Sequence, residues 1–301
     1  MDDTIRLDSI GQYNENMKVE TLHPLISLID FANANPDKPL KPVRINYGLF
    51  AIYLKDIKCG DIKYGCNYYD YQEGTLVFVA PGQVLTLENF RDNIKPKGRA
   101  LLFHPDLIRG TSLGQHIKDY TFFSYEVNEA LHLSERERNI VVDIMNQIEY
   151  ELGRGIDKHS KTLITTSIEL LLNYCVRFYD RQFITRGNVN KDILIKFEKL
   201  LEDYFNSGKT QAFGLPSVGY FADELNLSPN YFGDLIKKES GKSAQETVQL
   251  KLLDVAKERL FDTSKSVSEI AYELGFKYPQ HFTRLFKNAV GFSPNEYRLQ
   301  N

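Results

Sequence analysis

The 301-residue sequence lacks the features that mark several large classes of protein. Its three cysteines, Cys59, Cys66 and Cys175, cannot all pair and form no Cys-x-x-Cys unit, so we expect reduced thiols rather than a disulfide scaffold. No apolar run approaches the roughly 20 residues of a membrane span, and the first residues lack the basic-then-apolar order of a secretory signal. The net charge of −3 gives no indication of a nucleic-acid partner. These absences predict a globular, cytoplasmic protein that has no contact with a membrane.

The common catalytic fingerprints are also missing. The sequence has no Gly-x-Ser-x-Gly motif, no Walker A loop and no dinucleotide fingerprint. The histidines of the N-terminal region, His23, His104 and His116, are far apart in sequence, and we expect them at turns or on the surface rather than around a metal. The sequence therefore predicts that the chain is not an enzyme and needs no metal or cofactor.

Up to about residue 125, the sequence has the pattern of short strands between turns. Residues 44–54 are rich in aromatic and β-branched side chains, and residues 74–82 form an apolar run opened by glycine and closed by Pro-Gly. Further short apolar runs cover residues 85–87 and 100–103. Several short strands separated by turn residues favour a β-sandwich or a small barrel.

The pattern becomes helical at Ser134. The sequence Ser134-Glu135-Arg136-Glu137 predicts a capping box, and apolar residues then recur at helical spacing. Two more helices are predicted over about 158–183 and 191–205. Their apolar faces either complete the core, pack against a second copy of the chain, or do both. The polar segment 206–211 is the best candidate for a linker, and everything after it is predicted to be helical.

The C-terminal region repeats itself at an offset of 50 residues. Phe232, Leu235, Lys237, Gly241, Ser243 and Glu246 reappear as Phe282, Leu285, Lys287, Gly291, Ser293 and Glu296. Each copy has the layout of a helix-turn-helix, with helix starts predicted at Ser228-Pro229 and at the capping box 266–269. A helix of about 19 residues joins the copies and would be roughly 28 Å long. This length is compatible with placing the two second helices in successive major grooves, about 34–36 Å apart.

The second copy carries a family resemblance. The segments SVSEIAYELGF (266–276), HFTRLFK (281–287) and GFSPNEYR (291–298) resemble the signature of AraC/XylS-type transcription regulators. The DNA-binding resemblance covers about 215–298, and the N-terminal part looks like the cupin-type barrel and dimerisation helices of the same family. The resemblance implies binding to double-stranded promoter DNA as a homodimer. RNA polymerase and a small-molecule effector are further candidate partners.

Together, the pattern and the resemblance predict an α+β chain of three parts. Residues 1–130 form a cupin-like sensing β-barrel, residues 131–206 a helical dimerisation and linker segment, and residues 207–301 an all-α DNA-binding domain with two helix-turn-helix units. Two alternatives stay open: a cupin-type enzyme with a helical assembly tail, and a regulator whose barrel binds no small molecule. Against the enzyme, Gln83 stands where the resemblance would place a first metal-binding histidine.

The barrel offers no defined ligand site in the sequence, only aromatic residues that either stack on a ligand or fill the core. These residues are Tyr47, Phe50, Tyr53, Tyr64, Tyr68, Tyr69, Tyr71 and Phe78.

The predicted recognition helix of the second helix-turn-helix unit turns one set of side chains outward: Tyr278, Gln280, His281, Thr283, Arg284 and Lys287. Gln280 suits the N6/N7 edge of adenine and Arg284 the O6/N7 edge of guanine, whereas Lys287 suits a phosphate.

In the recognition helix of the first helix-turn-helix unit, the side chains predicted to face outward are those of Asn230, Tyr231, Gly233, Asp234, Lys237 and Lys238. Of these, we predict that Asn230, Tyr231 and Lys237 contact DNA. Asp234 takes the place of Arg284. Phosphates repel a carboxylate, although it can accept a hydrogen bond from cytosine N4. Asp234 is therefore either a cytosine reader or a residue that stabilises the first turn of its helix.

Overall fold

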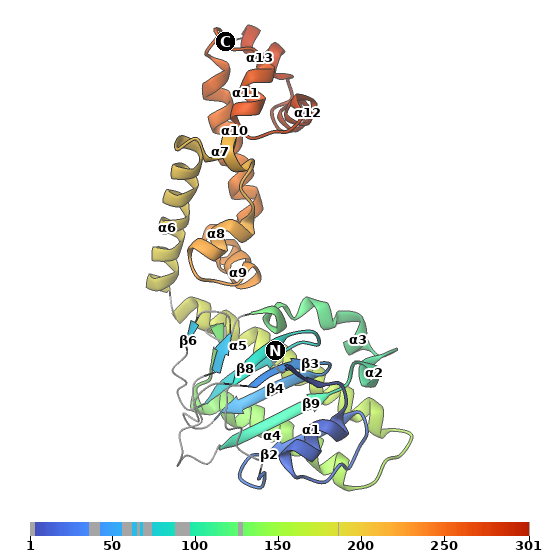
Figure 1. The fold of residues 1–301 in the computed structure, drawn as a ribbon. Helices are drawn as coiled ribbons and strands as arrows, with labels where there is room; N and C mark the ends of the chain where they lie inside the picture. Colours follow the sequence, from blue (N-terminus) through green and yellow to red (C-terminus); the bar gives the residue numbers. More distant parts are fainter. Residues whose placement is uncertain are drawn as a thin grey trace. The chain divides into compact units, whose positions relative to one another are not determined.

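The chain forms two compact units, Met1–Thr185 and Arg186–Asn301, which are described separately below. The computed structural model describes residues 4–35, 43–55, 62–64, 67–68, 74–87, 97–125, 129–185 and 187–300. The first unit combines strands and helices, and the second is helical, so the predicted α+β class is confirmed (Figure 1). Among the described residues, no helix is both long and apolar enough to cross a membrane.

The first unit contains two five-stranded sheets. In sheet order, the first has β1 (Thr4–Leu7), β3 (Val43–Tyr47), β8 (Val84–Leu87), β5 (Ile62–Tyr64) and β6 (Asn67–Tyr68). The second has β10 (Leu131–His132), β7 (Thr75–Val79), β4 (Phe50–Lys55), β9 (Gly98–Phe103) and β2 (Ile26–Asp30). The described pairs are antiparallel except β1 with β3. No described pair joins the two sheets, so closure into a cupin-like barrel stays a prediction.

The aromatic-rich run 44–54 is divided between the two sheets by a turn at Gly48. The Gly48 amide donates to the carbonyl of Leu7 at 2.8 Å. A Cβ atom at Gly48 would lie 2.6 Å from Oδ1 and 3.0 Å from Cα of Asp8, so only glycine fits this close approach without a shift. The turn passes the chain from β3 in one sheet to β4 in the other.

A tyrosine triad, Tyr13, Tyr47 and Tyr53, lies buried in the core that the two sheets share with helix α1 (Ile10–Met17). The hydroxyl of Tyr53 is 3.2 Å from that of Tyr13 and 3.0 Å from that of Tyr47, so the three hydroxyl groups are hydrogen-bonded to one another. Burial raises the pKa of Tyr47 to about 12 and also raises the pKa values of Tyr13 and Tyr53. Tyr47 and Tyr53 therefore fill the core as neutral groups.

The remaining aromatic candidates divide into two groups. Phe78 is buried and packs on Phe122 with ring centroids 4.4 Å apart, whereas Phe50 is only half-buried. The side chains of Tyr64, Tyr68, Tyr69 and Tyr71, like Cys59 and Cys66, lie outside the described residues. Cys175 is a free, buried thiol whose pKa is raised by that burial.

Two long helices complete the first unit. Helix α4 (Glu135–Gly153) begins with the predicted capping box, and α5 (Ser160–Thr185) packs along it (Figure 1). The Glu137 carboxylate accepts from Ser134 and, at 2.7 Å, from Nε of Arg181 on α5. Burial alone would raise the pKa of Glu137, but these hydrogen bonds outweigh it and the pKa is lowered. Glu137 thus both caps α4 and ties it to α5.

The predicted linker at 206–211 is wrong. Residues Lys209–Phe213 form helix α7, in which Thr210 is 1% exposed. The preceding helix, α6 (Gly187–Asn206), belongs to the second unit, because its buried Phe197 packs edge-on against Phe221 and Phe232 at 5.2 and 5.0 Å. The chain therefore divides into its two compact units after Thr185, and the predicted three-part functional division at 130 and 206 stays a prediction.

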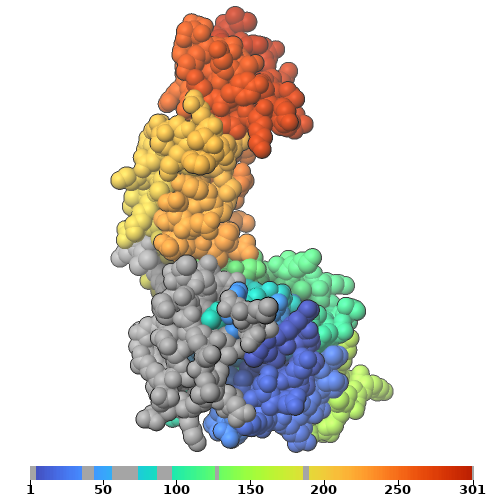
Figure 2. Space-filling view, viewed as in Figure 1, coloured from blue at the N-terminus to red at the C-terminus, as the bar shows by residue number. Residues whose placement is uncertain are grey.

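The two predicted helix-turn-helix units are present. The first has α8 (Val218–Glu224) and α9 (Pro229–Ser240), the second has α11 (Val267–Glu273) and α12 (Pro279–Val290), and α10 (Ala244–Leu260) joins them before α13 (Pro294–Gln300) closes the chain. The predicted serine caps form at Ser228 and Ser266, and Ser243 caps α10 in the same way. Helix α10 has 17 residues, so it is about 25 Å long. Figure 2 shows α11–α13 gathered as one lobe, drawn in orange to red.

Candidate nucleic-acid interface

Helix α12 presents one buried and one exposed face. Phe282 and Phe286 are fully buried, packing on Phe276 and Tyr297 with ring centroids 5.4 Å apart in each case. These aromatic contacts fix the rotation of the helix about its axis. The opposite face exposes Gln280, His281, Arg284 and Lys287, and Tyr278 is exposed just before the helix, as the sequence predicts.

The exposed face of α12 is chemically suited to recognise bases. Arg284 has no hydrogen bond or ion pair with any residue that the structure describes, so its planar set of donors is available. The rings of Tyr278 and His281 meet edge to face at 5.5 Å and flank the start of the helix. Thr283 is half-buried, and its hydroxyl donates to the carbonyl of Pro279 at 3.1 Å. Thr283 therefore offers an acceptor and a methyl group rather than a free donor.

Helix α9 also has a buried face and an exposed face, but its exposed side chains differ from those of α12. Phe232, Leu235 and Ile236 are buried, whereas Asn230 and Lys237 are exposed as predicted. Asp234 lies half-buried on the exposed side, where α12 has Arg284. The two helices therefore present opposite charges at equivalent positions.

The prediction that Tyr231 faces outward is wrong, because its side chain is only 4% exposed. Tyr231 lies four residues before Leu235, so both fall on the same side of the helix, which here faces the core. This i, i+4 relation of an aromatic to a core leucine is the sequence signal that identifies Tyr231 as a packing residue. Its counterpart in α12, His281, is exposed.

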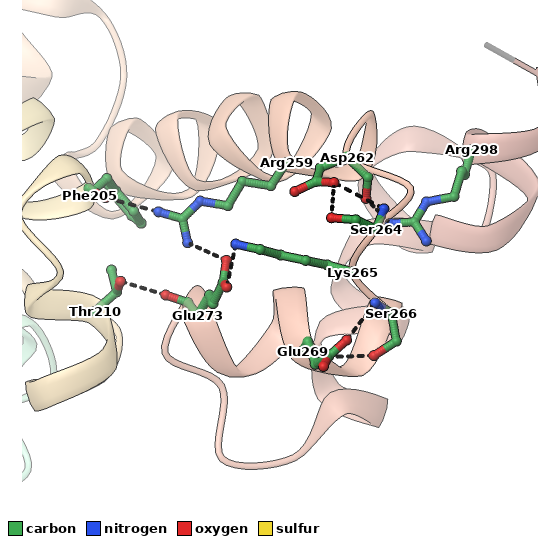
Figure 3. A network of polar contacts seen from close by, with 10 residues as sticks. All are labelled: Phe205, Thr210, Arg259, Asp262, Ser264, Lys265, Ser266, Glu269, Glu273 and Arg298. Atoms are coloured by element: carbon green, nitrogen blue, oxygen red, sulfur yellow. Dashed lines mark hydrogen bonds and ion pairs between the residues drawn. The ribbon is translucent and has the colours of Figure 1, made fainter.

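A polar network centred on Glu273 holds the second helix-turn-helix against the helices that precede it (Figure 3). The Glu273 carboxylate contacts Nζ of Lys265 at 2.6 Å and a guanidinium nitrogen of Arg259 at 3.8 Å. The Glu273 carbonyl accepts from the Thr210 hydroxyl at 2.6 Å, and Arg259 donates to the carbonyl of Phe205 at 3.1 Å. The network thus joins the end of α6, α7, α10 and α11.

Arg298 of α13 fixes the loop between α10 and α11. Its guanidinium donates to the carbonyl of Leu260 at 2.9 Å. It also donates to the carbonyl of Asp262 at 3.2 Å (Figure 3). The Asp262 carboxylate accepts from the hydroxyl and amide of Ser264, and these bonds lower the pKa of Asp262. Arg298 therefore ties α13 to the end of α10.

The three N-terminal histidines have local roles, at the positions that the sequence predicts. Nδ1 of His23 accepts from the amide of Leu25, Nδ1 of His104 caps α2 (Pro105–Ile108), and His116 ends α3 (Ser112–His116). Within the described ranges, no group of three or more His, Cys, Asp or Glu residues is placed to hold a metal ion.

A family model described as "Helix-turn-helix domain" matches residues 221–300. The Bacillus subtilis HTH-type transcriptional regulator YobQ is 33% identical over 254 residues, which cover 81% of this chain and 95% of YobQ. A solved AraC-type transcriptional regulator from Chromobacterium violaceum is 27% identical, with 28% of this chain and 76% of that chain covered and a TM-score of 0.27.

Other relatives match over shorter stretches. The B. subtilis regulator YtdP is 39% identical over 79 residues, which cover 26% of this chain. The chain spans 10% of YtdP, 21% of B. subtilis YesN and 52% of Escherichia coli YdiP.

Proposed function

Because the chain belongs to the AraC family of helix-turn-helix transcription regulators, which are not enzymes, we propose that it binds promoter DNA sequence-specifically through α9 and α12. The observation that supports this most strongly is the exposed face of α12, where Arg284 has no partner among the described residues. Phe282 and Phe286 fix the opposite side of the helix, so the guanidinium is held on a rigid element.

Each exposed residue has a proposed role in the major groove. Arg284 donates to guanine O6 and N7, Gln280 pairs with the N6/N7 edge of adenine, and Lys287 contacts a phosphate. Tyr278, His281 and Thr283 complete the contact face of α12. In α9, Asn230 reads a base edge and Lys237 contacts a phosphate.

Selection of DNA by the full chain tests this function. Immobilised protein is incubated with a pool of random duplexes, and the bound molecules are amplified and sequenced over several rounds. We expect one enriched motif with two short conserved blocks. Recovery of unenriched sequences would show that the chain does not recognise DNA by sequence.

The proposed homodimer uses a stripe on α5. Leu163, Leu170 and Ile184 are exposed apolar residues that, with Arg177, recur every seven residues along one side of this helix. Seven-residue spacing is the repeat that keeps a helix face against a partner helix. Residues 210–301 contain 11 basic and 11 acidic residues, so DNA binding by one chain is expected to be modest and dimerisation to strengthen it.

Replacing Leu170 by glutamate is expected to convert the dimer to a monomer, since the interface would have to bury a charge. Sedimentation equilibrium measures the mass directly. Val176→Glu is the matched control, because Val176 is 41% exposed, close to the 45% of Leu170, but lies off the stripe. Monomeric wild-type protein, or loss of the dimer in both variants, would contradict this assignment.

We place the proposed effector beside the predicted cupin-like barrel rather than inside it, because the tyrosine triad fills the core. A cleft of about 660 Å³ lies among residues that include Phe50, Ile108 and Tyr120. Its lining has two cations, of which Arg109 pairs with Asp106 at 2.9 Å, whereas Lys118 has no partner within the described part of the chain. An apolar lining with a free ammonium favours a small organic anion with an apolar body.

Thermal-shift measurements on the full chain with a panel of such anions test this site. An anion that raises the melting temperature of the wild type is expected to lose most of its effect in Ser124→Trp, which fills the cleft from its rim, and in Lys118→Gln. An undiminished shift in both variants would place the ligand elsewhere. If no anion stabilises the wild type, the alternative of a regulator without a small-molecule ligand is favoured.

Two further parts of the proposal follow from the role in transcription. A regulator bound at a promoter lies next to RNA polymerase, which therefore stays a predicted partner. The cytoplasm, where bacterial promoter DNA lies, stays the predicted location.

A further inference from the structure

Helix α9 carries a glycine at a position where glycine weakens a helix. Gly233 follows the first residue of this 12-residue helix by four positions, so it lies in the helix interior. In such a place, glycine lowers the helix-forming equilibrium roughly two- to fivefold relative to alanine, because its unfolded backbone has more freedom to lose.

No feature of the fold accounts for this glycine. Gly233 is not among the glycines with a positive φ, so its backbone conformation is open to any residue. A Cβ atom built at Gly233 meets no heavy atom within 4 Å, so no neighbouring element comes close enough to require the missing side chain. By contrast, a Cβ at Gly275 would lie 2.7 Å from the carbonyl carbon of Gly214.

The position of Gly233 relates it to DNA. At 100° per residue, Asn230, Gly233, Asp234 and Lys237 fall within about 100° of one another, opposite the buried Phe232 and Leu235. Gly233 therefore lies at one edge of the face that we propose for DNA contact, midway along that face from Asn230 to Lys237. Its counterpart in α12 is Thr283, so the two recognition helices differ in bulk at this position of their contact faces.

We infer that Gly233 lets the main chain of α9 pack directly on a base edge in the major groove, with the thymine C5-methyl group as the preferred contact. This inference rests on the proposed DNA-binding function. The Cα methylene of glycine offers apolar surface and no hydrogen-bonding side chain, and the thymine methyl is the apolar group of the major-groove edge. Glycine is also the residue that permits the closest approach of a backbone to a ligand.

The same contact explains how α9 can read DNA without the arginine present in α12. A helix that lies closer to the floor of the groove brings the short side chains of Asn230 and Asp234 within reach of base edges. Asn230 and Asp234 have shorter side chains than their counterparts, Gln280 and Arg284. We therefore assign Asp234 the role of accepting from a cytosine amino group rather than stabilising the helix start.

The variant Gly233→Ala tests the inference, with the duplex selected by the wild-type chain as the probe. We expect Gly233→Ala to melt at the same temperature as the wild type or a few degrees higher, and to bind the selected duplex at least about tenfold more weakly. Gly153→Ala is the control, because Gly153 lies at the end of α4 with no atom within 4 Å of an added Cβ. This control is expected to bind DNA like the wild type.

Uracil substitution then tests the partner of Gly233. Each thymine of the selected motif is replaced in turn by uracil, which removes only the C5-methyl group. At one position, uracil is expected to restore most of the binding lost in Gly233→Ala, because the two methyl groups no longer compete for the same space.

The outcomes separate the two hypotheses. If the wild type enriches a motif but Gly233→Ala binds it within twofold of wild type, the close approach at Gly233 is wrong while the proposed function holds. A loss of binding that no uracil relieves would overturn the base-edge contact. If the wild type enriches no motif, the proposed function fails, and the role of Gly233 fails with it.

Discussion

Replacing Arg284 by alanine is expected to weaken binding of the selected duplex roughly 5- to 150-fold, because one bidentate contact to guanine contributes about 1–3 kcal/mol. The fold should not change, since Arg284 is exposed and has no partner among the residues described. Fluorescence anisotropy titration at one fixed salt concentration measures the effect. A fixed concentration is needed because the phosphate contribution to affinity falls steeply with salt.

Two controls separate base reading from charge. Arg284→Lys keeps the positive charge but loses the planar fork, so we expect it to retain attraction to DNA while losing discrimination at one base pair. Arg154→Ala removes another exposed arginine, one whose guanidinium lies over the ring of Tyr150 in the first unit. Equal binding by Arg284→Ala, Arg154→Ala and wild type would show that Arg284 does not read DNA.

Replacing Gly275 by alanine is expected to destabilise the second helix-turn-helix by about 2–5 kcal/mol. Gly275 has a φ of +93°, a conformation that costs other residues roughly 1–2 kcal/mol. In addition, a Cβ there would lie 2.8 Å from the carbonyl oxygen of Thr210 and 2.9 Å from the amide nitrogen of Leu215. Because these are backbone atoms, relief requires the α7 segment to move, at a cost of about 1–3 kcal/mol.

Gly291→Ala is the matched control for Gly275→Ala. Gly291 has a φ of +88°, but an added Cβ there meets nothing within 4 Å, so this variant bears only the conformational cost. Urea unfolding of both variants, followed by circular dichroism, isolates the contribution of the close approach. Equal stability of the two variants would show that α7 does not pack tightly on the turn after α11.

The elements with local signals are the ones that the sequence predicts well. A serine and a glutamate three residues apart define the capping boxes at Ser134 and Ser266, and each forms as expected. The exposed face of α12 is predictable for the same reason, since Phe282 and Phe286 mark the buried side. For such features, the interacting residues lie within one or two helical turns.

Features that depend on distant partners could not be predicted. The segment 206–211 is polar and has the composition of a linker, yet Thr210 is buried because its hydroxyl meets the carbonyl of Glu273, 63 positions along the chain. The division of the run 44–54 between two sheets likewise depends on the approach of Gly48 to Asp8. Tyr231 is a different case, because its spacing from Leu235 already indicates the buried side of the helix.

Chemical footprinting of the full chain on its selected duplex examines both recognition helices at once. Dimethyl sulfate, which methylates guanine N7 in the major groove, is suited to this purpose. We expect each chain to protect two major-groove patches on one side of the duplex, centred about 10–10.5 base pairs apart, with Arg284→Ala losing protection in one patch alone. A single patch for each chain, or two patches on opposite sides of the duplex, would contradict paired reading by α9 and α12.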